Sequence, residues 1–156
     1  MRAVFLDRDG VINNYPGDTK YIVSWKDFCF LPGVKEAIAK LTKEGFKIFV
    51  ISNQAGVSKG IYSQQELDGI TRNMLKEIAE SGGQIEEVYY CTHRDEDNCS
   101  CRKPKAGLID KIKEKYPIEP NRTFFIGDTI RDVKTARAGG CKSILVLSGK
   151  EKTNNP

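Results

Sequence analysis

Two carboxylates stand at the end of the first apolar run of the chain. Residues 3–6 are apolar, and Asp7 and Asp9 follow directly, with Gly10 after them. Because side chains of a strand alternate between its faces, both carboxylates project to the same side, and Gly10 allows a tight turn. Two close anions raise each other's pKa unless a cation or a division of acid and base roles relieves them. The pair therefore indicates a divalent-metal site or a catalytic dyad, with a polar strand end facing solvent as the plain alternative.

Further reactive side chains follow the later apolar runs. They are Ser52 and Asn53 after the second run, Cys91 and His93 after the third, and Gly127, Asp128, Thr129 and Asp132 after the fourth. In open parallel sheets, ligands bind beyond the carboxyl ends of the strands. Carboxylates from the first and fourth runs could share one Mg²⁺, a hard cation that prefers oxygen ligands. The positive charge of this ion would also mask the negative charges of a carboxylate and a phosphate dianion, so that the carboxylate could attack the phosphate.

A second group of ligating residues lies in the segment 91–101. It consists of Cys91, His93, Cys99 and Cys101. Three thiols and one imidazole are typical ligands of a closed, structural zinc site, and the polar residues 95–98 between them could not bury the thiols in an apolar segment. The alternative is a set of surface thiols. Because the segment ends directly before Arg102 and Lys103, a zinc ion there would fix the backbone that carries both cations.

Short apolar runs alternate with helical patterns along the chain. Strands are predicted over residues 3–6, 47–51, 87–90, 123–126 and 143–147, because each run is short, rich in β-branched or aromatic residues and bounded by turn or polar residues. Helices are predicted over 33–44, 107–116 and 131–138, with a longer one that starts from a capping box at Ser63 and Glu66. This alternation predicts an α/β fold, a doubly wound, Rossmann-like parallel sheet flanked by helices.

Composition limits the remaining possibilities. The chain has 156 residues and a net charge of +4, which suits one domain over residues 1–149 with a flexible tail over 150–156. No apolar stretch approaches the roughly 20 residues of a membrane span, and no signal-peptide pattern is present, so we expect a cytoplasmic protein. We expect a monomer that has no membrane or nucleic-acid partner. Cys29 and Cys141 lack ligating neighbours and are predicted to be buried as small hydrophobic residues.

The motifs, taken together, resemble those of the haloacid dehalogenase superfamily of phosphatases. The matching segments are Leu6-Asp7-Arg8-Asp9-Gly10, Ile51-Ser52-Asn53-Gln54, Arg102-Lys103-Pro104, and Gly127-Asp128-Thr129 with Asp132. The intervals 10–52 and 53–103 are too short for a separate cap domain, since a domain normally needs at least roughly 50 residues of its own. We therefore expect an open site whose specificity depends on loops 13–21 and 56–62 and on the zinc loop with Arg102.

The resemblance implies a role for each matching residue. Asp7 would be the nucleophile that forms an aspartyl phosphate, and Asp9 the general acid and base. Ser52 and the amide of Asn53 would hold phosphoryl oxygens, Lys103 would neutralise charge at the nucleophile, and the Mg²⁺ ligands would be Asp7, Asp128 and the Asp9 carbonyl. Asp132 is either a supporting acid or a helix-start residue. Thr129 is either part of the acidic motif or a helix cap. Arg102 suits an anionic or polyhydroxyl substrate, with an ordinary surface arginine as the alternative.

Capless members with such a cysteine-histidine loop resemble two groups, the D-glycero-D-manno-heptose 1,7-bisphosphate 7-phosphatases and the histidinol-phosphate phosphatases. The segments 53–60 and 148–150 are similar to the heptose group, whereas the short gap from His93 to Cys99 is similar to the histidinol group. We favour the heptose bisphosphate by analogy. Two other classes fit worse. A phospho-accepting receiver domain needs its reactive aspartate after a middle strand, and a zinc-knuckle nucleic-acid binder leaves the acidic residues without a role.

Overall fold

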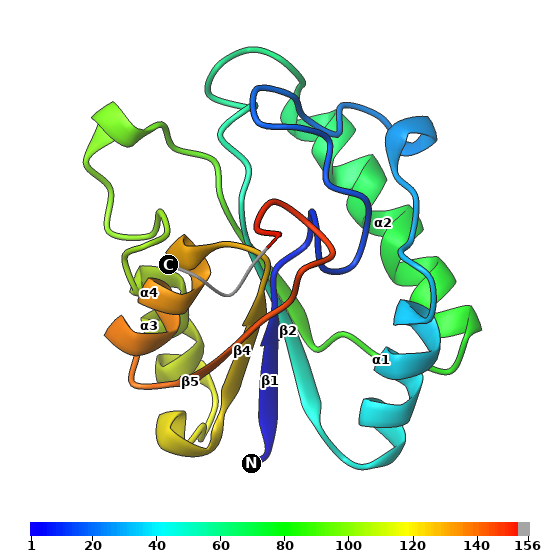
Figure 1. The fold of residues 1–156 in the computed structure, drawn as a ribbon, viewed down its shortest axis with the longest axis vertical. Coiled ribbons are helices and arrows are strands. Elements are labelled where there is room, and N and C mark those ends of the chain that lie inside the picture. Colours follow the sequence, from blue (N-terminus) through cyan, green and yellow to red (C-terminus); the bar gives the residue numbers. More distant parts are fainter. Residues whose placement is uncertain (153–156) are drawn as a thin grey trace.

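Five parallel strands form one sheet with helices on both faces (Figure 1). In the computed structural model, which describes residues 1–152, the strands are β1 (Ala3–Leu6), β2 (Lys47–Asn53), β3 (Glu87–Cys91), β4 (Phe124–Gly127) and β5 (Lys142–Leu145). Their order across the sheet is β3-β2-β1-β4-β5. The chain therefore winds outward to one side of β1 and then to the other. This confirms the predicted doubly wound α/β fold.

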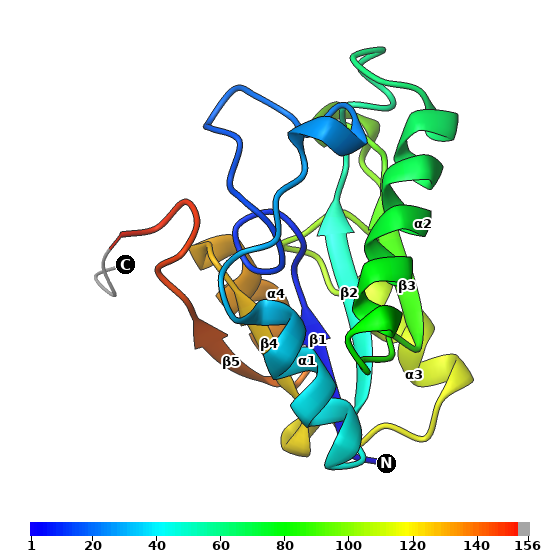
Figure 2. The same cartoon turned by 90° about the vertical axis from the view of Figure 1, so that its right-hand side faces the viewer.

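Two pairs of helices cover the sheet. They are α1 (Val34–Lys43) and α2 (Gln64–Glu80) on one face, and α3 (Gly107–Lys115) and α4 (Ile130–Ala138) on the other (Figures 1 and 2). Three short 3₁₀ helices complete the described elements: η1 (Trp25–Asp27), η2 (Asp95–Asp97) and η3 (Pro120–Arg122). Between β1 and α1 the described chain has only η1 and loops. This interval therefore contains no separate cap domain.

Side-chain alternation along β1 divides the core into two layers. Val4 and Leu6 point into the cluster beneath α1 and α2, while Ala3 and Phe5 point into the cluster beneath α3 and α4. All four residues are buried. The central strand is thus apolar on both faces, as a parallel sheet covered by helices requires.

Capping residues fix where two helices begin. The predicted capping box of α2 is present in both halves: the Glu66 N–H donates to Ser63 Oγ at 3.0 Å, and the Ser63 N–H donates to the Glu66 carboxylate at 2.7 Å. Thr129 and Asp132 form the same box at the start of α4. That helix begins directly after β4, so its first turn lies at the carboxyl edge of the sheet.

Strand β2 extends two residues further toward that edge than predicted from the sequence, whereas β5 ends two residues earlier than predicted, at Leu145. Ser52 and Asn53 are the last residues of β2 and pair with Tyr90 and Cys91 of β3. The parallel ladder continues past the apolar run because backbone hydrogen bonding does not depend on side-chain polarity. Ser52 and Asn53 are therefore held on the end of a strand and not on a loop.

The prediction that Cys29 is buried is wrong. Its backbone N–H is bonded to the Asn14 side chain, but its side chain is exposed. Phe28 and Phe30 on either side pack against the core, and alternation along this extended segment turns Cys29 outward. Cys141 packs against the cluster beneath α3 and α4 and is partly buried.

The C-terminal segment differs at its start from the expected flexible tail. The backbone N–H groups of Lys150 and Glu151 donate to Asp128, at 2.9 Å to its carboxylate and 3.0 Å to its carbonyl. The remainder of the predicted tail, residues 153–156, lies outside the described residues. No helix among residues 1–152 has the length and apolar character needed to cross a membrane.

Candidate active site

An open cavity of about 250 Å³ lies at the carboxyl edge of the sheet. It is lined by every residue that the sequence analysis assigned to phosphate chemistry: Asp7, Asp9, Ser52, Asn53, Arg102, Lys103 and Asp128. These residues come from the ends of β1, β2 and β4 and from the segment after the cysteines. The cavity also borders all three predicted specificity loops, through residues such as Tyr15, Lys59 and Arg102.

A buried lysine connects two carboxylates at the floor of this cavity. Lys103 Nζ lies 3.1 Å from Asp7 Oδ1 and 2.6 Å from Asp132 Oδ1, and all three side chains are nearly inaccessible to solvent. Burial lowers the pKa of Lys103, but the two carboxylates outweigh it and raise the pKa above its usual value. The lysine is therefore a permanent cation beside Asp7.

The cavity floor carries more negative than positive charge. Asp7, Asp128 and Asp132 each offer a carboxylate oxygen, and these oxygens lie within 4.8 Å of one another. Burial first, and then Asp132, raise the pKa of Asp7 well above its usual value; burial also raises that of Asp128. Three carboxylates face a single lysine, and they offer oxygen ligands only. Such a group fits a hard divalent cation such as Mg²⁺.

Close backbone packing holds Asp128 in place. A Cβ at Gly10 would lie 2.2 Å from Asp128 Oδ2, and one at Gly149 would lie 2.1 Å from the same atom. The Lys150 N–H donates to that oxygen, and Ser148 Oγ donates to the Gly10 carbonyl at 2.8 Å. Two glycines at these positions allow the backbone to approach the carboxylate from both sides.

Asp132 has two functions in the structure, between which the sequence could not choose. Its Oδ2 accepts from the N–H groups of Asp128 and Thr129 and from Thr129 Oγ, at 2.9 to 3.2 Å, as a helix-start residue does. Its Oδ1 pairs with Lys103. Burial raises the pKa of Asp132, but Lys103 and these donors outweigh it, so the pKa lies below its usual value. The same carboxylate thus caps α4 and orients the buried lysine.

Asp9 faces the cavity from the turn after β1, apart from this acidic group. Its Oδ1 accepts from Arg8 Nε at 2.9 Å and from Asn13 Nδ2 at 3.0 Å. The side chain is 24% exposed. Asp9 is therefore anchored through one oxygen while its side chain stays partly open to solvent at the cavity.

The end of β2 holds the backbone of Lys103. Asn53 Oδ1 accepts from the Lys103 N–H at 3.0 Å, and Asn53 Nδ2 donates to the Lys103 carbonyl at 3.2 Å. The side chain of Asn53 is therefore engaged in positioning the lysine. Ser52 is buried and lines the cavity, and its Oγ accepts from Gln54 Nε2 at 3.0 Å.

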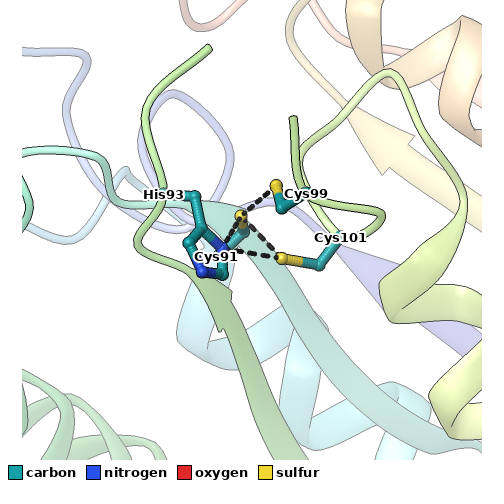
Figure 3. Close-up of side chains that lie close together, drawn as sticks. All are labelled: Cys91, His93, Cys99 and Cys101. Atoms are coloured by element: carbon teal, nitrogen blue, oxygen red, sulfur yellow. Dashed lines mark hydrogen bonds between the residues drawn. The ribbon is translucent and has the colours of Figure 1, made fainter. Parts of the chain in front are cut away.

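The predicted zinc ligands converge at one point (Figure 3). Cys91 Sγ lies 2.8 Å from Cys101 Sγ and 3.6 Å from Cys99 Sγ, and His93 Nδ1 lies 3.3 Å from Cys101 Sγ. Burial raises the pKa of Cys91 to about 12. Burial also raises the pKa of Cys99, but the Arg102 N–H together with hydrogen bonds from Cys91 and Cys101 outweighs it and lowers the pKa to about 7. Four soft ligands at the edge of one sheet fit a tetrahedral Zn²⁺.

The guanidinium of Arg102 is held within the same loop. Its Nε donates to Asp95 Oδ1 at 2.5 Å, and its NH1 donates to the His93 carbonyl at 3.2 Å. Arg102 still lines the cavity. The structure thus places the predicted substrate-binding arginine at the cavity wall in an orientation that the loop determines.

Four buried polar residues next to the active-site carboxylates and Ser52 were not predicted from the sequence. Arg8, Asn13, Gln54 and Tyr62 are all buried, and hydrogen bonds connect them to Asp9 and Ser52. A signal for Arg8 was present, since a residue between two carboxylates that share one face of a strand must point to the opposite face. That face is the core, where an arginine needs partners.

Comparisons with known proteins agree with this geometry. A family model described as HAD-hydrolase-like matches residues 100–155. The chain is 38% identical over 147 residues to the D-glycero-beta-D-manno-heptose-1,7-bisphosphate 7-phosphatase of Pseudomonas aeruginosa, covering 94% of this chain and 82% of that protein. It is 32% identical over 151 residues to the D-glycero-alpha-D-manno-heptose-1,7-bisphosphate 7-phosphatase of Campylobacter jejuni, with coverages of 97% and 85%.

A solved structure shares the fold over nearly all of this chain. The D,D-heptose 1,7-bisphosphate phosphatase from B. bronchiseptica, complexed with magnesium and phosphate, matches with a TM-score of 0.91 and 32% identity. The match covers 96% of this chain and 82% of that one. On this combination of motifs, site geometry and similarity, the chain belongs to the haloacid dehalogenase-like hydrolases and is a phosphatase of that family.

Proposed function

We propose that this phosphatase removes the 7-phosphate of D-glycero-D-manno-heptose 1,7-bisphosphate through an aspartyl-phosphate intermediate. The observation that carries the proposal is the pairing of buried Asp7 with Lys103, beside Asp9, on the floor of one open cavity. The choice of sugar rests on the names of the relatives, which include enzymes for both the alpha and the beta bisphosphate.

In the proposed reaction Asp7 attacks the phosphorus atom. The Arg8 N–H donates to Asp7 Oδ1 at 2.8 Å and Lys103 contacts the same oxygen, so the carboxylate cannot rotate freely. Asp9 protonates the leaving sugar oxygen and later takes a proton from the water that cleaves the aspartyl phosphate. Ser52 and the backbone amide of Asn53 bind phosphoryl oxygens at the end of β2, and Lys103 offsets the charge that gathers on them.

Two metal ions complete the proposal. Asp7, Asp128 and the Asp9 backbone carbonyl would hold Mg²⁺, with Asp132 beside them. Bound Mg²⁺ would supply the positive charge that allows a carboxylate to approach a phosphate dianion. Cys91, His93, Cys99 and Cys101 would hold a structural Zn²⁺ that fixes the loop before Lys103.

Cations around the cavity suit a substrate with two phosphates. Lys20, Lys59, Arg102, Arg131 and Lys150 all line it. Lys103 serves the phosphoryl group under attack, which leaves these outer cations for the second phosphate. A phosphorylated amino alcohol carries a single phosphate and a positive amine, so it would use this charge less well.

Phosphate release from two substrates tests the proposal. With Mg²⁺ present, we expect kcat/KM for the heptose 1,7-bisphosphate to exceed that for histidinol phosphate by at least tenfold, with loss of the 7-phosphate signal in ³¹P NMR. Faster turnover of histidinol phosphate would contradict the sugar assignment.

The Asp7→Asn variant tests the nucleophile. It should release no phosphate and have an unchanged circular dichroism spectrum. Residual turnover in this variant would contradict the assignment of Asp7 as the nucleophile.

We also propose that residues 1–149 act as one domain, as a cytoplasmic monomer without a nucleic-acid or membrane partner. Both core clusters share the strands of one sheet, which supports a single folding unit. Light scattering during gel filtration at assay concentration should give the mass of one chain. A dimer mass at that concentration would contradict the monomer.

A further inference from the structure

Arg8 is a fully buried arginine beside the catalytic carboxylates. It has 0% exposure, and its Nε lies 2.9 Å from Asp9 Oδ1. The guanidinium carbon lies 6.0 Å from the centroid of the Phe28 ring and 5.7 Å from that of Tyr90. Burying a charge is unfavourable unless the charge is paired and hydrogen-bonded. Aromatic rings and a carboxylate therefore fix both the place and the direction of this guanidinium.

A second donor reaches the same oxygen of Asp9. Asn13 is buried, and its Nδ2 donates to Asp9 Oδ1 at 3.0 Å and to the Asn14 carbonyl at 3.2 Å. Both partners are acceptors, so the amide must present its NH₂ group here. The Asn13 N–H in turn donates to the Arg8 carbonyl at 3.3 Å, which ties the two donors to one turn.

The same guanidinium also contacts Gln54, the residue that follows β2. Arg8 NH2 donates to Gln54 Oε1 at 3.3 Å, and Tyr62 OH donates to the same oxygen at 2.5 Å. Gln54 Nε2 then donates to Ser52 Oγ. Arg8 is thus linked to Ser52 through Gln54, whereas it contacts Asp9 directly.

We propose that Arg8, together with Asn13, is a positioning residue that holds Asp9 by Oδ1 and presents Oδ2 to the substrate. This inference rests on the proposed function, in which Asp9 is the acid and base. When the bond from phosphorus to the leaving oxygen breaks, its electron pair stays on that oxygen, which takes the proton from Asp9. In the second step, water attacks the aspartyl phosphate, the bond from Asp7 to phosphorus breaks, and Asp9 regains a proton from the water.

The leaving group distinguishes this role from a general effect on structure. A sugar alkoxide is a strong base and needs protonation as it leaves, whereas p-nitrophenolate is a weak base and leaves without it. The ratio kcat/KM covers steps only up to the departure of the leaving group. A residue that acts through the acid therefore affects kcat/KM for the sugar phosphate much more than that for p-nitrophenyl phosphate.

Arg8→Met tests the proposal by kcat/KM on heptose 1,7-bisphosphate and on p-nitrophenyl phosphate. We expect a fall of about 100-fold on the sugar phosphate, within the usual range for general acid catalysis, and a markedly smaller fall on the aryl phosphate. The matched control is Arg122→Met, since Arg122 is exposed and pairs with Glu119 outside the cavity. Both activities of that control should equal those of the unchanged protein.

An equal fall of Arg8→Met on both substrates, or no fall, would overturn the proposal. If the unchanged protein hydrolyses neither substrate, it is the proposed function that fails. If Arg8→Met does not fold by circular dichroism, Asn13→Ala decides instead: it should show the same selective loss at smaller size, and an equal loss on both substrates would overturn the inference. In an Asp9→Asn background, Arg8→Met should reduce p-nitrophenyl phosphate turnover no further.

Discussion

At the scale of single residues, the site depends on carboxylates whose two oxygens have different partners. Asp132 accepts helix N–H groups with one oxygen and binds Lys103 with the other. Asp7 and Asp9 are likewise each held by Oδ1. An ionised carboxylate accepts on both oxygens, so one side chain can be anchored to the fold and still take part in chemistry.

The two functions of Asp132 can be separated by substitution. Asp132→Asn keeps an oxygen for the α4 cap but removes the charge that pairs with Lys103, so we expect activity to fall by about 10- to 100-fold. Thr129→Ala removes cap bonds and leaves that charge, so it should lower the free energy of unfolding by about 1 kcal/mol and keep most of the activity. Phosphate release and urea denaturation measure the two effects. If both variants lose activity equally, the cap alone explains Asp132.

At the scale of elements, the strand ends and the cysteine loop bring distant segments together. Lys103 reaches Asp7 because Asn53 binds its backbone and because the cysteine loop ends two residues before it. The loop joins β3 to α3 and has few apolar contacts of its own, apart from its thiols. We therefore expect its conformation to depend on the metal.

Cys101→Ser should remove the bound zinc and loosen this loop. We expect zinc content, measured by mass spectrometry, to fall from one per chain toward zero, and Tm to fall by at least about 5 °C, equivalent to about 1–2 kcal/mol. Activity should fall as well, because Lys103 loses support. The matched control is Cys29→Ser at an exposed cysteine, which should keep its zinc and its Tm. An unchanged Tm in Cys101→Ser would rule out structural zinc.

Helix α2 offers a substitution with an effect on stability alone. Ser63→Ala removes the side-chain acceptor of the capping box, which should cost about 1 kcal/mol in urea denaturation. The box is exposed, so kcat/KM should be unchanged. A loss of activity without a loss of stability would show that the start of α2 contributes to the site.

At the scale of the whole molecule, the fold gathers negative charge that is unfavourable without a metal. The pKa of Asp7 and that of Asp128 are both raised, chiefly by burial. The folded state therefore keeps these protons to higher pH than the unfolded state does. Stability from these groups is present below the unfolded pKa of about 3.9 and is lost as pH rises through the raised values.

Asp128→Asn tests this electrostatic cost. Without Mg²⁺, the Tm of the variant minus that of the unchanged protein should increase as pH rises from about 4 toward neutral, because the variant lacks the ionising carboxylate. Added Mg²⁺ at 100 times its Kd should stabilise the unchanged protein by about 2.7 kcal/mol and the variant hardly at all. Differential scanning calorimetry measures both. A flat or falling difference would contradict the raised pKa of Asp128.

Much of this protein could be predicted from its sequence. The alternation of apolar runs and helical patterns predicted the parallel sheet, and the residues at the strand ends predicted the cavity lining. Both follow from local periodicity, because strands of a parallel sheet bring their carboxyl ends to one edge. The capping box of α2 was also predicted, since its two residues are close in sequence.

What the sequence by itself determined was therefore the fold class and which residues meet at the site. Only the tertiary structure decided what each of them contacts. It turned Cys29 outward, assigned Asp132 to both Lys103 and the α4 cap, engaged Asn53 with the Lys103 backbone, and enclosed Arg8 beneath Asp9. These outcomes depend on contacts between segments far apart in the chain. Local patterns carry no information on such distances, because packing and hydrogen-bond geometry select the partners only once the sheet has formed.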